Sequence, residues 1–496
     1  SMPCPPMSEG GIALVAFNAR WAHCAHALRL LRAGLGDLRP RCRIHEFTIA
    51  DDPRAAAERV LATAPRLVGI SCSVWNLAAS CCFCEAVRAA APQTVLVAGG
   101  PEVGLADHPP RLRACVDTLV TGEGESTFAT LARDCLAGMR PPLVIHGAPL
   151  EATAIPPAAD EYTAEDCAHR LVYLETTRGC PHRCGYCTSA VAGPLRRLPA
   201  QQVRATITDL IARGATTLKF LDRSINADPE HAAGLLAFCA TQHRPGLRVH
   251  LEMLPDRFTE QLNRSIAAYP AGGLQLEIGL QSLDPAVLAA SGRQCDIDAA
   301  LAHLQRLAAT GVHLHLDLIA GLPGEELSGI AHGFDTLYAL GPQEIQLGIL
   351  KRLRDTPFAA RALPGHHFES TPPYALLASP QLTFATVQAL RRFARYFERI
   401  HNAGDLPHTA RLLCAGPSAF AAFMAVSEFL WARFGRTHAI AFPRLCSALH
   451  TWLIEHRGCP ADTVTNALAA DWAALPGRKG PPACIQETVR RLRHAR

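Results

Sequence analysis

The chain has 496 residues and a formal net charge of +4, with 49% apolar and 19% charged residues. This composition excludes a disordered chain and is typical of a globular protein with two or three domains. So mild a positive charge does not by itself indicate nucleic acid binding, and no apolar run is long enough to span a bilayer. The first residues, SMPCPPMSEGG, lack the charged and apolar regions of a signal peptide, so we expect a cytoplasmic protein without a membrane partner.

Nineteen cysteines are a high count for this composition. In a chain with no secretion signal, they are expected to be reduced thiols, metal ligands or small buried residues rather than disulfides.

The N-terminal region alternates short apolar runs with helical stretches rich in Ala, Arg and Leu. This alternation predicts an α/β unit over residues 10–140, with a doubly wound parallel sheet. Two expected strands end in AGGPE (98–102) and TGEGE (121–125). Ligands bind at such carboxyl ends, and glycines there leave room for a flat ligand to approach the backbone. The expected floor of this ligand site comprises Asn18, Cys72, Gly99, Gly100 and Gly122.

Three further regions follow. Residues 141–170 are rich in Pro and Ala and are predicted to be a linker. Residues 171–371 contain six strand-like runs, each followed by a helical run, which predicts a partial (β/α)6 barrel. Residues 372–496 are predicted to form a helical domain. Polar residues recur where the barrel strands end, at Asp222, Glu252, Glu277, Gln281 and Asp317.

The barrel begins with three closely spaced cysteines, Cys180, Cys184 and Cys187, in the stretch ETTRGCPHRCGYC. Structural zinc sites and iron–sulfur clusters normally use four ligands. Three thiolates on a 4Fe–4S cluster would leave one iron open to chelate a small molecule and pass it an electron. Arg178 and Arg183 would supply positive charge beside such a cluster. The alternatives are a zinc loop with a distant fourth ligand, or chance in a cysteine-rich chain.

The stretch ETTRGCPHRCGYC resembles the signature of the radical S-adenosylmethionine (SAM) enzymes, including the aromatic residue before the last cysteine. The segments FLDRSINAD, LQLEIGLQSLDP and HLHLDLIAGLPGE resemble strand ends of that family's partial barrel. The N-terminal sheet resembles the cobalamin-binding domain that precedes the barrel in one large subclass. The helical tail resembles that of a branch of the same subclass.

The resemblance implies that Cys180, Cys184 and Cys187 hold a 4Fe–4S cluster and that SAM binds its open iron. It also implies a small-molecule substrate and an electron donor such as flavodoxin or ferredoxin. The cofactor contacts it implies are Tyr186, Asp222, Arg223, Glu277, Gln281, Ile319 and Gly321. Asp222 and Arg223 replace the family's usual Gly-Gly-Glu. For each strand-end carboxylate, a buried structural ion pair is the alternative.

Whether cobalamin binds is left open by the sequence. Many cobalamin-binding domains carry Asp-x-His-x-x-Gly, and this chain has no such motif. His23 and His26 lie near the first expected strand end with the wrong spacing, and we interpret them as helix-surface residues. Cobalamin would therefore bind without a histidine on cobalt, or the domain would have lost it.

A second group of cysteines, Cys72, Cys81, Cys82 and Cys84, lies in SCSVWNLAASCCFCE. Cys81 and Cys84 share a helix face and would suit a soft ligand, with core packing as the alternative. The radical SAM enzyme of arsinothricin biosynthesis moves the 3-amino-3-carboxypropyl group of SAM onto arsenite, and a cysteine-rich relative would suit that substrate.

Four functions therefore stand side by side. The first two are transferases that cleave SAM reductively, one moving a methyl group with cobalamin and the other moving an aminocarboxypropyl group. A non-catalytic cobalamin- or metal-sensing protein would need the sheet but not an intact SAM site. A zinc-stabilised nucleic acid binder is disfavoured by the mild charge and by an aromatic content of 6%.

Overall fold

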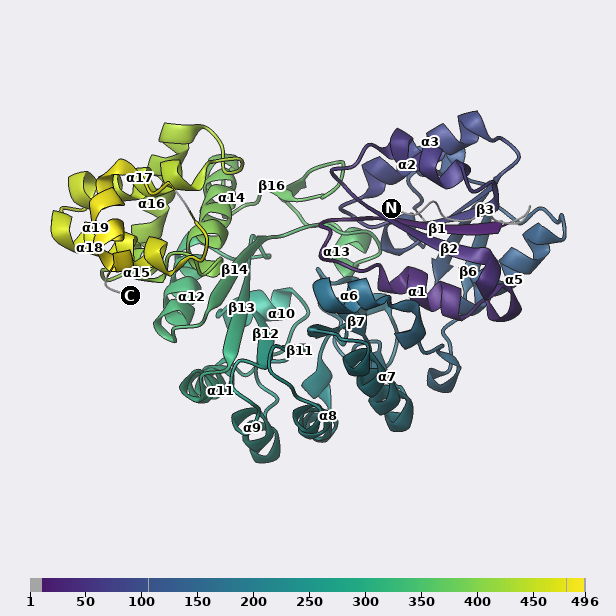
Figure 1. Cartoon of the computed structure of the whole chain (residues 1–496), viewed down its shortest axis with the longest axis horizontal. Coiled ribbons are helices and arrows are strands. Elements are labelled where there is room, and N and C mark those ends of the chain that lie inside the picture. The colour runs from purple at the N-terminus through teal and green to yellow at the C-terminus, as the bar shows by residue number, and fades with distance from the viewer. Residues whose placement is uncertain (1–10, 106, 479, 495–496) are drawn as a thin grey trace.

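The structure is a computed structural model that describes residues 11–105, 107–478 and 480–494. Two six-stranded parallel sheets are followed by a group of helices at the C-terminal end (Figure 1). Residues 1–10, which contain most of the N-terminal stretch used above to predict the location, lie outside the described residues. Within the described residues, no helix combines the length and the apolar character that a membrane crossing requires.

The N-terminal sheet has the strand order β2-β1-β3-β4-β5-β6, and all its pairs are parallel. Its strands are β1 (Gly11–Asn18), β2 (Cys42–Thr48), β3 (Pro65–Ser71), β4 (Val95–Gly99), β5 (Thr118–Gly122) and β6 (Val144–Gly147). Helices α1 (His26–Ala33) and α5 (Glu125–Leu136) share a core with one face of the sheet. Helices α2 (Pro53–Leu61), α3 (Leu77–Ala90) and α4 (Pro110–Cys115) cover the other face. All eight residues of β1 are buried because the sheet is covered on both faces.

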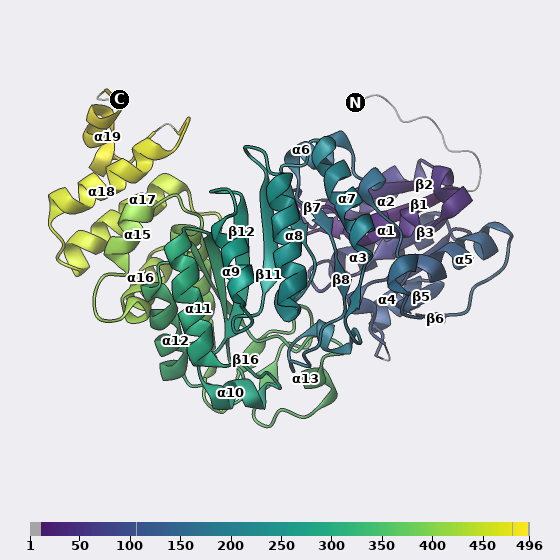
Figure 2. The same ribbon diagram turned by 90° about the horizontal axis from the view of Figure 1, so that it is seen from below.

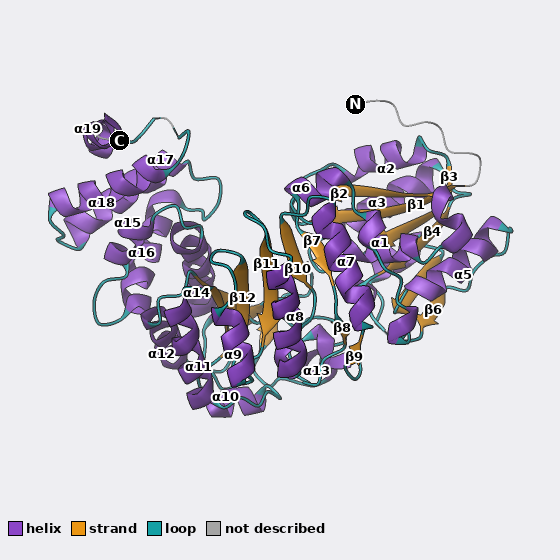
Figure 3. Ribbon diagram, turned by 60° about the horizontal axis from the view of Figure 1, so that its bottom comes forward, coloured by secondary structure: helices purple, strands orange, loops and turns teal. Residues whose placement is uncertain are grey.

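The second sheet is open, and its six parallel strands neighbour one another in chain order. They are β7 (Val172–Leu174), β10 (Thr217–Phe220), β11 (Arg248–Met253), β12 (Leu274–Gln281), β13 (His313–Ala320) and β14 (Glu344–Ile349). Helices α7 (Ala200–Ala212), α8 (Pro229–Thr241), α9 (Glu260–Ala267), α11 (Ile297–Thr310) and α12 (Leu327–Ala339) lie along its outer side (Figures 2 and 3). Every second residue of β13 is buried, so its leucines face the helices and its polar residues face the concave side. The predicted fold class is confirmed.

Short elements surround the barrel mouth. They are β8 (Thr177–Arg178), β9 (Arg196–Arg197), α10 (Pro285–Ala290), α13 (Pro357–Ala360), β15 (His367–Phe368) and β16 (Leu376–Ala378). β8 and β9 pair antiparallel on either side of the three-cysteine stretch, and therefore close it into a loop.

The segment predicted to be a linker is packed. β6 joins the first sheet beside β5, and α6 (Ala164–His169) leads into β7. Tyr162 and Cys167 are buried in the same core as the barrel. Residues 141–170 therefore contribute to both units that they connect.

The C-terminal helices are α14 (Phe384–Phe397), α15 (Pro407–Leu413), α16 (Ala419–Phe434), α17 (Phe442–Thr451), α18 (Ala461–Ala474) and α19 (Gln486–His494). Their core is continuous with that of the barrel. The ring of Phe334 on α12 lies edge-on to those of Phe393 and Phe397, with centroids 5.0 Å apart in each pair. The C-terminal helices thus pack directly against α12, the last long helix of the barrel.

Candidate functional site

The loop between β8 and β9 carries Cys180, Cys184 and Cys187 and is here called the cysteine loop. At Gly185 it is held by backbone hydrogen bonds to two other segments of the chain. The backbone N–H of Gly185 donates to the carbonyl of Ser291 at 2.7 Å, and its carbonyl accepts from the N–H of Phe358 at 2.8 Å. A Cβ at Gly185 would lie 2.1 Å from the Phe358 ring, so only glycine fits here. The loop therefore has one fixed conformation between two distant segments of the chain.

Each of the three cysteine sulfurs has a different polar neighbour. Cys180 Sγ lies 3.7 Å from the hydroxyl of Ser224, and Cys187 Sγ accepts from the backbone N–H of Ser189 at 3.4 Å. Polar groups around thiolates stabilise their charge and tune the potential of a cluster that they hold. In the part of the chain that the structure describes, no three Cys, His, Asp or Glu side chains converge on a position for a single ion. Cluster thiolates bind separate irons and do not need to converge.

The third sulfur, that of Cys184, accepts from the guanidinium of Arg293 at 3.9 Å. Arg293 is 9% exposed, also donates to the carbonyl of Gly279, and has no partner for its Nε. The side chain of Gln281 covers Gly279. A Cβ built on Gly279 would lie 2.2 Å from Gln281 Nε2 and 4.0 Å from Asp317 Oδ2. Gln281 and Asp317 thus lie around Gly279, the residue whose carbonyl Arg293 binds. No motif in the sequence indicates Arg293, which is distant in the chain from Cys184.

Asp222 is a structural residue in this fold. It is 1% exposed and accepts from the backbone N–H of Thr176 at 2.9 Å, and from the hydroxyls of Thr176 and Thr177 at 2.6 Å each. Because its oxygens are engaged, the alternative of a buried structural carboxylate describes it better than the SAM contact that the resemblance implied. The Arg223 side chain is 54% exposed, and its guanidinium lies 3.9 Å from Glu252.

Tyr186 and the residues of DLIAGLPGE lie around the same mouth. The ring of Tyr186 meets that of Phe358 edge-on at 6.4 Å, and its hydroxyl is buried without a hydrogen-bond partner. Ile319 lies on β13 at a position that alternates with the helix-facing leucines. Gly321 has a φ of +93°, and a Cβ there would lie 2.2 Å from Leu376. This glycine is therefore required for packing under β16.

Glu277 lies deeper in the barrel and is already paired. Its carboxylate accepts from Lys219 Nζ at 3.2 Å and contacts His250 Nε2 at 2.8 Å. Burial alone would raise the pKa of Glu277, but the hydrogen bond with His250 and the charge of Lys219 outweigh it and lower the pKa to about 2. This carboxylate is thus ionised and occupied by neighbouring side chains.

A second polar group lines the adjacent strands. His315 lies 3.1 Å from Asp317 and 3.2 Å from Glu344. Burial lowers the pKa of His315, but these carboxylates outweigh it and raise the pKa to about 9. Burial raises the pKa of Glu252 to about 7. The concave face of the barrel is therefore strongly polar, with both signs of charge in contact.

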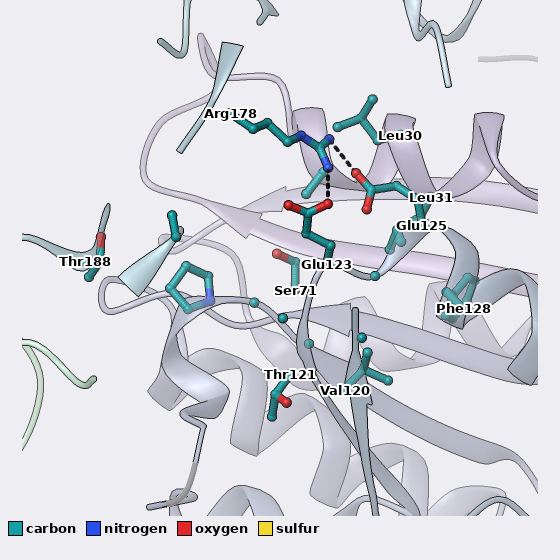
Figure 4. A pocket seen from close by; sticks show the side chains of 18 of the residues that line it. Leu30, Leu31, Ser71, Val120, Thr121, Glu123, Glu125, Phe128, Arg178 and Thr188 are labelled. Atoms are coloured by element: carbon teal, nitrogen blue, oxygen red, sulfur yellow. Dashed lines mark hydrogen bonds and ion pairs between the residues drawn. The ribbon is translucent and has the colours of Figure 1, made fainter. Parts of the chain in front are cut away.

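A cavity of about 580 Å³ lies at the carboxyl ends of β3 to β6 (Figure 4). Its floor contains Gly99, Gly100 and Gly122, as the sequence predicts. A Cβ at Gly100, where φ is +103°, would lie 2.5 Å from the carbonyl of Cys72. Asn18 and Cys72 do not line the cavity. Asn18 instead donates to the carbonyl of His23, and Cys72 is fully buried below Gly100.

The cavity reaches from the sheet to the cysteine loop. Thr188, Ser189 and Val191, which directly follow Cys187, line its upper side. Beside the glycines, the cavity continues into an apolar part between α1, α5 and the face of the sheet that they cover. The residues lining that part are Leu28, Leu31, Gly69, Val97, Val120 and Phe128. One loop thus separates this cavity from the three thiols.

The cavity wall carries a charged cluster centred on Arg178 (Figure 4). Its guanidinium contacts Glu123 at 3.2 Å, Glu125 at 2.5 Å and Glu175 at 2.6 Å. Arg196 also pairs with Glu123. Glu123 and Glu125 belong to TGEGE, a motif from which the sequence analysis used only the glycine.

A comparison with known families decides the nature of the barrel. Residues 174–336 match the family model described as "Radical SAM superfamily". Residues 174–336 therefore form a radical SAM domain. The matched residues, here called the radical SAM domain, contain the cysteine loop and four complete barrel strands, β10 to β13.

Two curated relatives are methyltransferases. The cobalamin-dependent radical SAM methyltransferase TokK of Streptomyces tokunonensis is 25% identical over 323 residues, covering 58% of this chain and 47% of TokK. The 2-(S-pantetheinyl)-carbapenam-3-carboxylate methyltransferase of Streptantibioticus cattleyicolor is 26% identical over 319 residues, covering 57% and 46%. The chain spans about half the length of these relatives.

Two solved structures share the fold. The radical SAM methyltransferase TsrM from Kitasatospora setae, solved with cobalamin and a [4Fe-4S] cluster, gives a TM-score of 0.59 at 18% identity, covering 75% of this chain and 79% of TsrM. The cobalamin-dependent SAM radical enzyme OxsB gives 0.61 at 11% identity, covering 99% and 81%. The sheet, the radical SAM domain and the C-terminal helices together thus have the fold of cobalamin-dependent radical SAM enzymes.

The cysteines of the second group do not line the cavity. Cys72, Cys81 and Cys84 are buried on the face of the sheet covered by α3, whereas the apolar part of the cavity lies on the opposite face. Burial raises the pKa of Cys81 to about 12, which disfavours the thiolate. Cys82 accepts from Arg111 at 3.2 Å on an exposed surface. The structure does not bring these thiols to a site near the cysteine loop, and core packing accounts for the three buried ones.

His23 and His26 are not free surface residues. His23 Nδ1 lies 2.6 Å from the hydroxyl of Tyr173 on β7, and His26 Nδ1 lies 2.9 Å from the hydroxyl of Tyr162. Burial lowers the pKa of His26 to about 3, so the ring is neutral, and it also lines the cavity. Both histidines join the N-terminal sheet unit to β7 and to the segment that leads into it.

Proposed function

We propose that this chain is a cobalamin-dependent radical SAM transferase that moves a methyl group to a small-molecule substrate. The observation that carries the proposal is the cavity over Gly99, Gly100 and Gly122, whose upper side is formed by the residues that follow Cys187. A flat ligand on the glycines and a cluster on the cysteines would then lie on two sides of one loop. Transfer between two such cofactors requires this proximity.

In this proposal, Cys180, Cys184 and Cys187 hold a 4Fe–4S cluster, and SAM binds the open iron. The cluster, when bound, supplies the electron that cleaves SAM. The surroundings of the thiols fit a cluster, because Ser224, Ser189 and Arg293 each place a polar group beside one sulfur.

SAM would lie between the cluster and the barrel mouth. Arg293 and Asp317 carry charges that suit its carboxylate and its ammonium or ribose, and Gln281 offers an amide. Tyr186, Ile319 and Gly321 remain proposed contacts on the adenine side. Glu277 and Arg223 also remain proposed contacts, although neighbours engage Glu277 and Arg223 is largely exposed.

The cavity fits a corrinoid in two respects. Gly99, Gly100 and Gly122 form its floor, so no side chain of these residues separates a ligand from the backbone. Its apolar depth offers space for a flat aromatic tail. The corrinoid, when bound, supplies a carrier for the methyl group. Because the chain lacks Asp-x-His-x-x-Gly, we propose that no histidine binds cobalt.

Two further observations favour methyl transfer over aminocarboxypropyl transfer to arsenite. The curated relatives are named as methyltransferases. None of the thiols expected to capture a soft substrate lines the cavity, namely Cys72, Cys81, Cys82 and Cys84. A small-molecule substrate and a flavodoxin- or ferredoxin-type electron donor complete the proposal.

The experiment is an anaerobic reconstitution of the whole chain. We expect about four iron and four sulfide per chain, and retention of added hydroxocobalamin after desalting. Cys184→Ala should lose the iron and all SAM cleavage, whereas Cys239→Ala, a buried cysteine of α8, should lose neither. Stoichiometric zinc, or a protein that retains no cobalamin, contradicts the proposal. Transfer of an aminocarboxypropyl group with formation of methylthioadenosine would contradict methyl transfer alone.

A further inference from the structure

The two glycine motifs of the N-terminal sheet end in glutamates that arginines of the barrel bind. Glu102 of AGGPE accepts from Arg354 Nε at 2.9 Å and also from the hydroxyl of Tyr374. Glu125 of TGEGE lies 2.5 Å from Arg178. The same two motifs thus provide both the floor of the cavity and the carboxylates that face the barrel.

Each of these arginines belongs to a segment that touches the cysteine loop. Arg178 lies in β8, the strand that leads directly into Cys180. Arg354 lies in the segment whose Phe358 donates its backbone N–H to Gly185 in the middle of the loop. The ion pairs therefore connect the sheet to the strand that leads into the loop and to one of the two segments that hold Gly185.

The pairs are poorly accessible to water. The side chains of Glu102 and Glu125 are 3% and 8% exposed, and those of Arg178 and Arg354 are 11% and 18% exposed. Arg178 also contacts Glu123 and Glu175, and Arg354 also pairs with Asp107. Glu125 and Glu102 are the poorly exposed carboxylates that link these arginines to the glycine motifs, so their contacts favour one arrangement of the two units. Both arginines and Glu125 also line the cavity.

We propose that Arg178 and Arg354 are positioning residues, which with Glu125 and Glu102 fix the cysteine loop over the cavity from two sides. They would thereby set the separation between a corrinoid in the cavity and a cluster on the loop. This inference rests on the proposed function. Without such contacts, the N-terminal sheet unit and the barrel would move relative to one another, as domains do by default. A displacement of about 1 Å between reacting groups lowers the rate of the reaction on the order of a hundredfold.

The test compares Glu102→Gln and Glu125→Gln with wild-type protein carrying both cluster and cobalamin. Glu161→Gln is the matched control. Glu161 pairs with Arg32 at 2.5 Å and Arg39 at 2.6 Å between the sheet unit and its connecting segment, but it does not line the cavity. The readouts are iron content, retained cobalamin, and the magnetic interaction between the reduced cluster and cob(II)alamin in frozen samples.

We expect both test variants to retain iron and cobalamin, with the magnetically coupled fraction falling about twofold or more because the freed interface samples several arrangements. Glu161→Gln should match wild type. The charge exchange Arg178→Glu with Glu125→Arg should recover part of the coupling that Arg178→Glu alone loses.

Unchanged coupling in both test variants would overturn the inference and leave the proposed function intact. Loss of cobalamin from Glu125→Gln would assign that residue to binding rather than positioning and would also overturn it. Wild-type protein that retains no cobalamin would contradict the proposed function itself, and with it this inference.

Discussion

The guanidinium of Arg293 lies 3.9 Å from the sulfur of Cys184, in a position where Arg293 is 9% exposed and its Nε has no partner. A buried positive charge beside one thiol of three makes the sulfurs of the loop inequivalent. It stabilises added negative charge on whatever the loop holds.

We therefore predict that Arg293→Gln makes the cluster harder to reduce. Losing a charge-assisted hydrogen bond of about 1.5–3 kcal/mol corresponds to roughly 60–130 mV for a one-electron couple. An anaerobic redox titration followed by electron paramagnetic resonance measures this shift. Arg293→Lys should retain most of the potential, and Arg223→Gln, which changes a largely exposed arginine, should not move it. An unchanged reduction potential in Arg293→Gln would show that Arg293 does not influence the cluster.

Gln281→Ala is expected to weaken SAM binding by roughly tenfold, because the amide lies beside Asp317 at the barrel mouth and contributes about one hydrogen bond. SAM titration of the reconstituted protein measures the affinity, with iron content as the control for an intact cluster. Glu277→Ala belongs in the same series. An equal or larger loss would support its sequence-based assignment to SAM, whereas an unchanged affinity would assign Glu277 to Lys219 and His250 alone.

Gly99→Leu is expected to abolish cobalamin retention. Gly99 lines the cavity in an ordinary backbone conformation, and a Cβ there would meet only Val120, at 3.5 Å or more. The larger side chain therefore occupies the cavity without straining the chain. Gly234→Leu, on the exposed side of α8 with open space around it, is the matched control. Normal cobalamin absorbance in Gly99→Leu after desalting would place the ligand elsewhere.

Glu325→Gln is expected to be more stable than wild type at alkaline pH. Burial raises the pKa of Glu325 to about 7, and its hydrogen bond from Ser282 does not offset this. Between about pH 4.5 and 7 the folded state keeps a proton that the unfolded state has released, so wild-type stability falls as the pH rises and is lowest above pH 7. The neutral glutamine does not release a proton.

The difference between the two proteins should therefore rise from about 1 kcal/mol at pH 5 to roughly 3 kcal/mol at pH 8. Urea unfolding at both pH values, with equal cofactor content, measures it. Glu326→Gln, at the exposed neighbouring position, should show no such difference. A constant difference across the range would contradict the raised pKa of Glu325.

The alternation of strands and helices predicted both sheets correctly, because parallel strands covered on both faces leave an unmistakable apolar pattern. The glycines of AGGPE and TGEGE also marked the cavity, since glycine at a strand end reports on space near the backbone. These features depend on residues close together in the chain. Local pattern is sufficient for them.

Contacts between distant segments could not be predicted in the same way. Asp222 follows its strand as an open-site carboxylate would, yet Thr176 and Thr177 of another segment engage it. Cys72 lies at a strand end too, but it faces the α3 side of the sheet. Only the packed structure determines which face a side chain occupies and which partners reach it.

The shared core of the barrel and the C-terminal helices limits how this chain can be divided. Phe334 meets Phe393, Phe397 and Phe420 at ring separations of 5.0 to 5.8 Å. A shortened protein that ends before Phe384 would expose the Phe334 side of α12 as an apolar patch, and it would aggregate rather than fold as a smaller enzyme. The C-terminal helices thus cover α12 of the barrel, so experiments on isolated pieces should keep the barrel and the helices together.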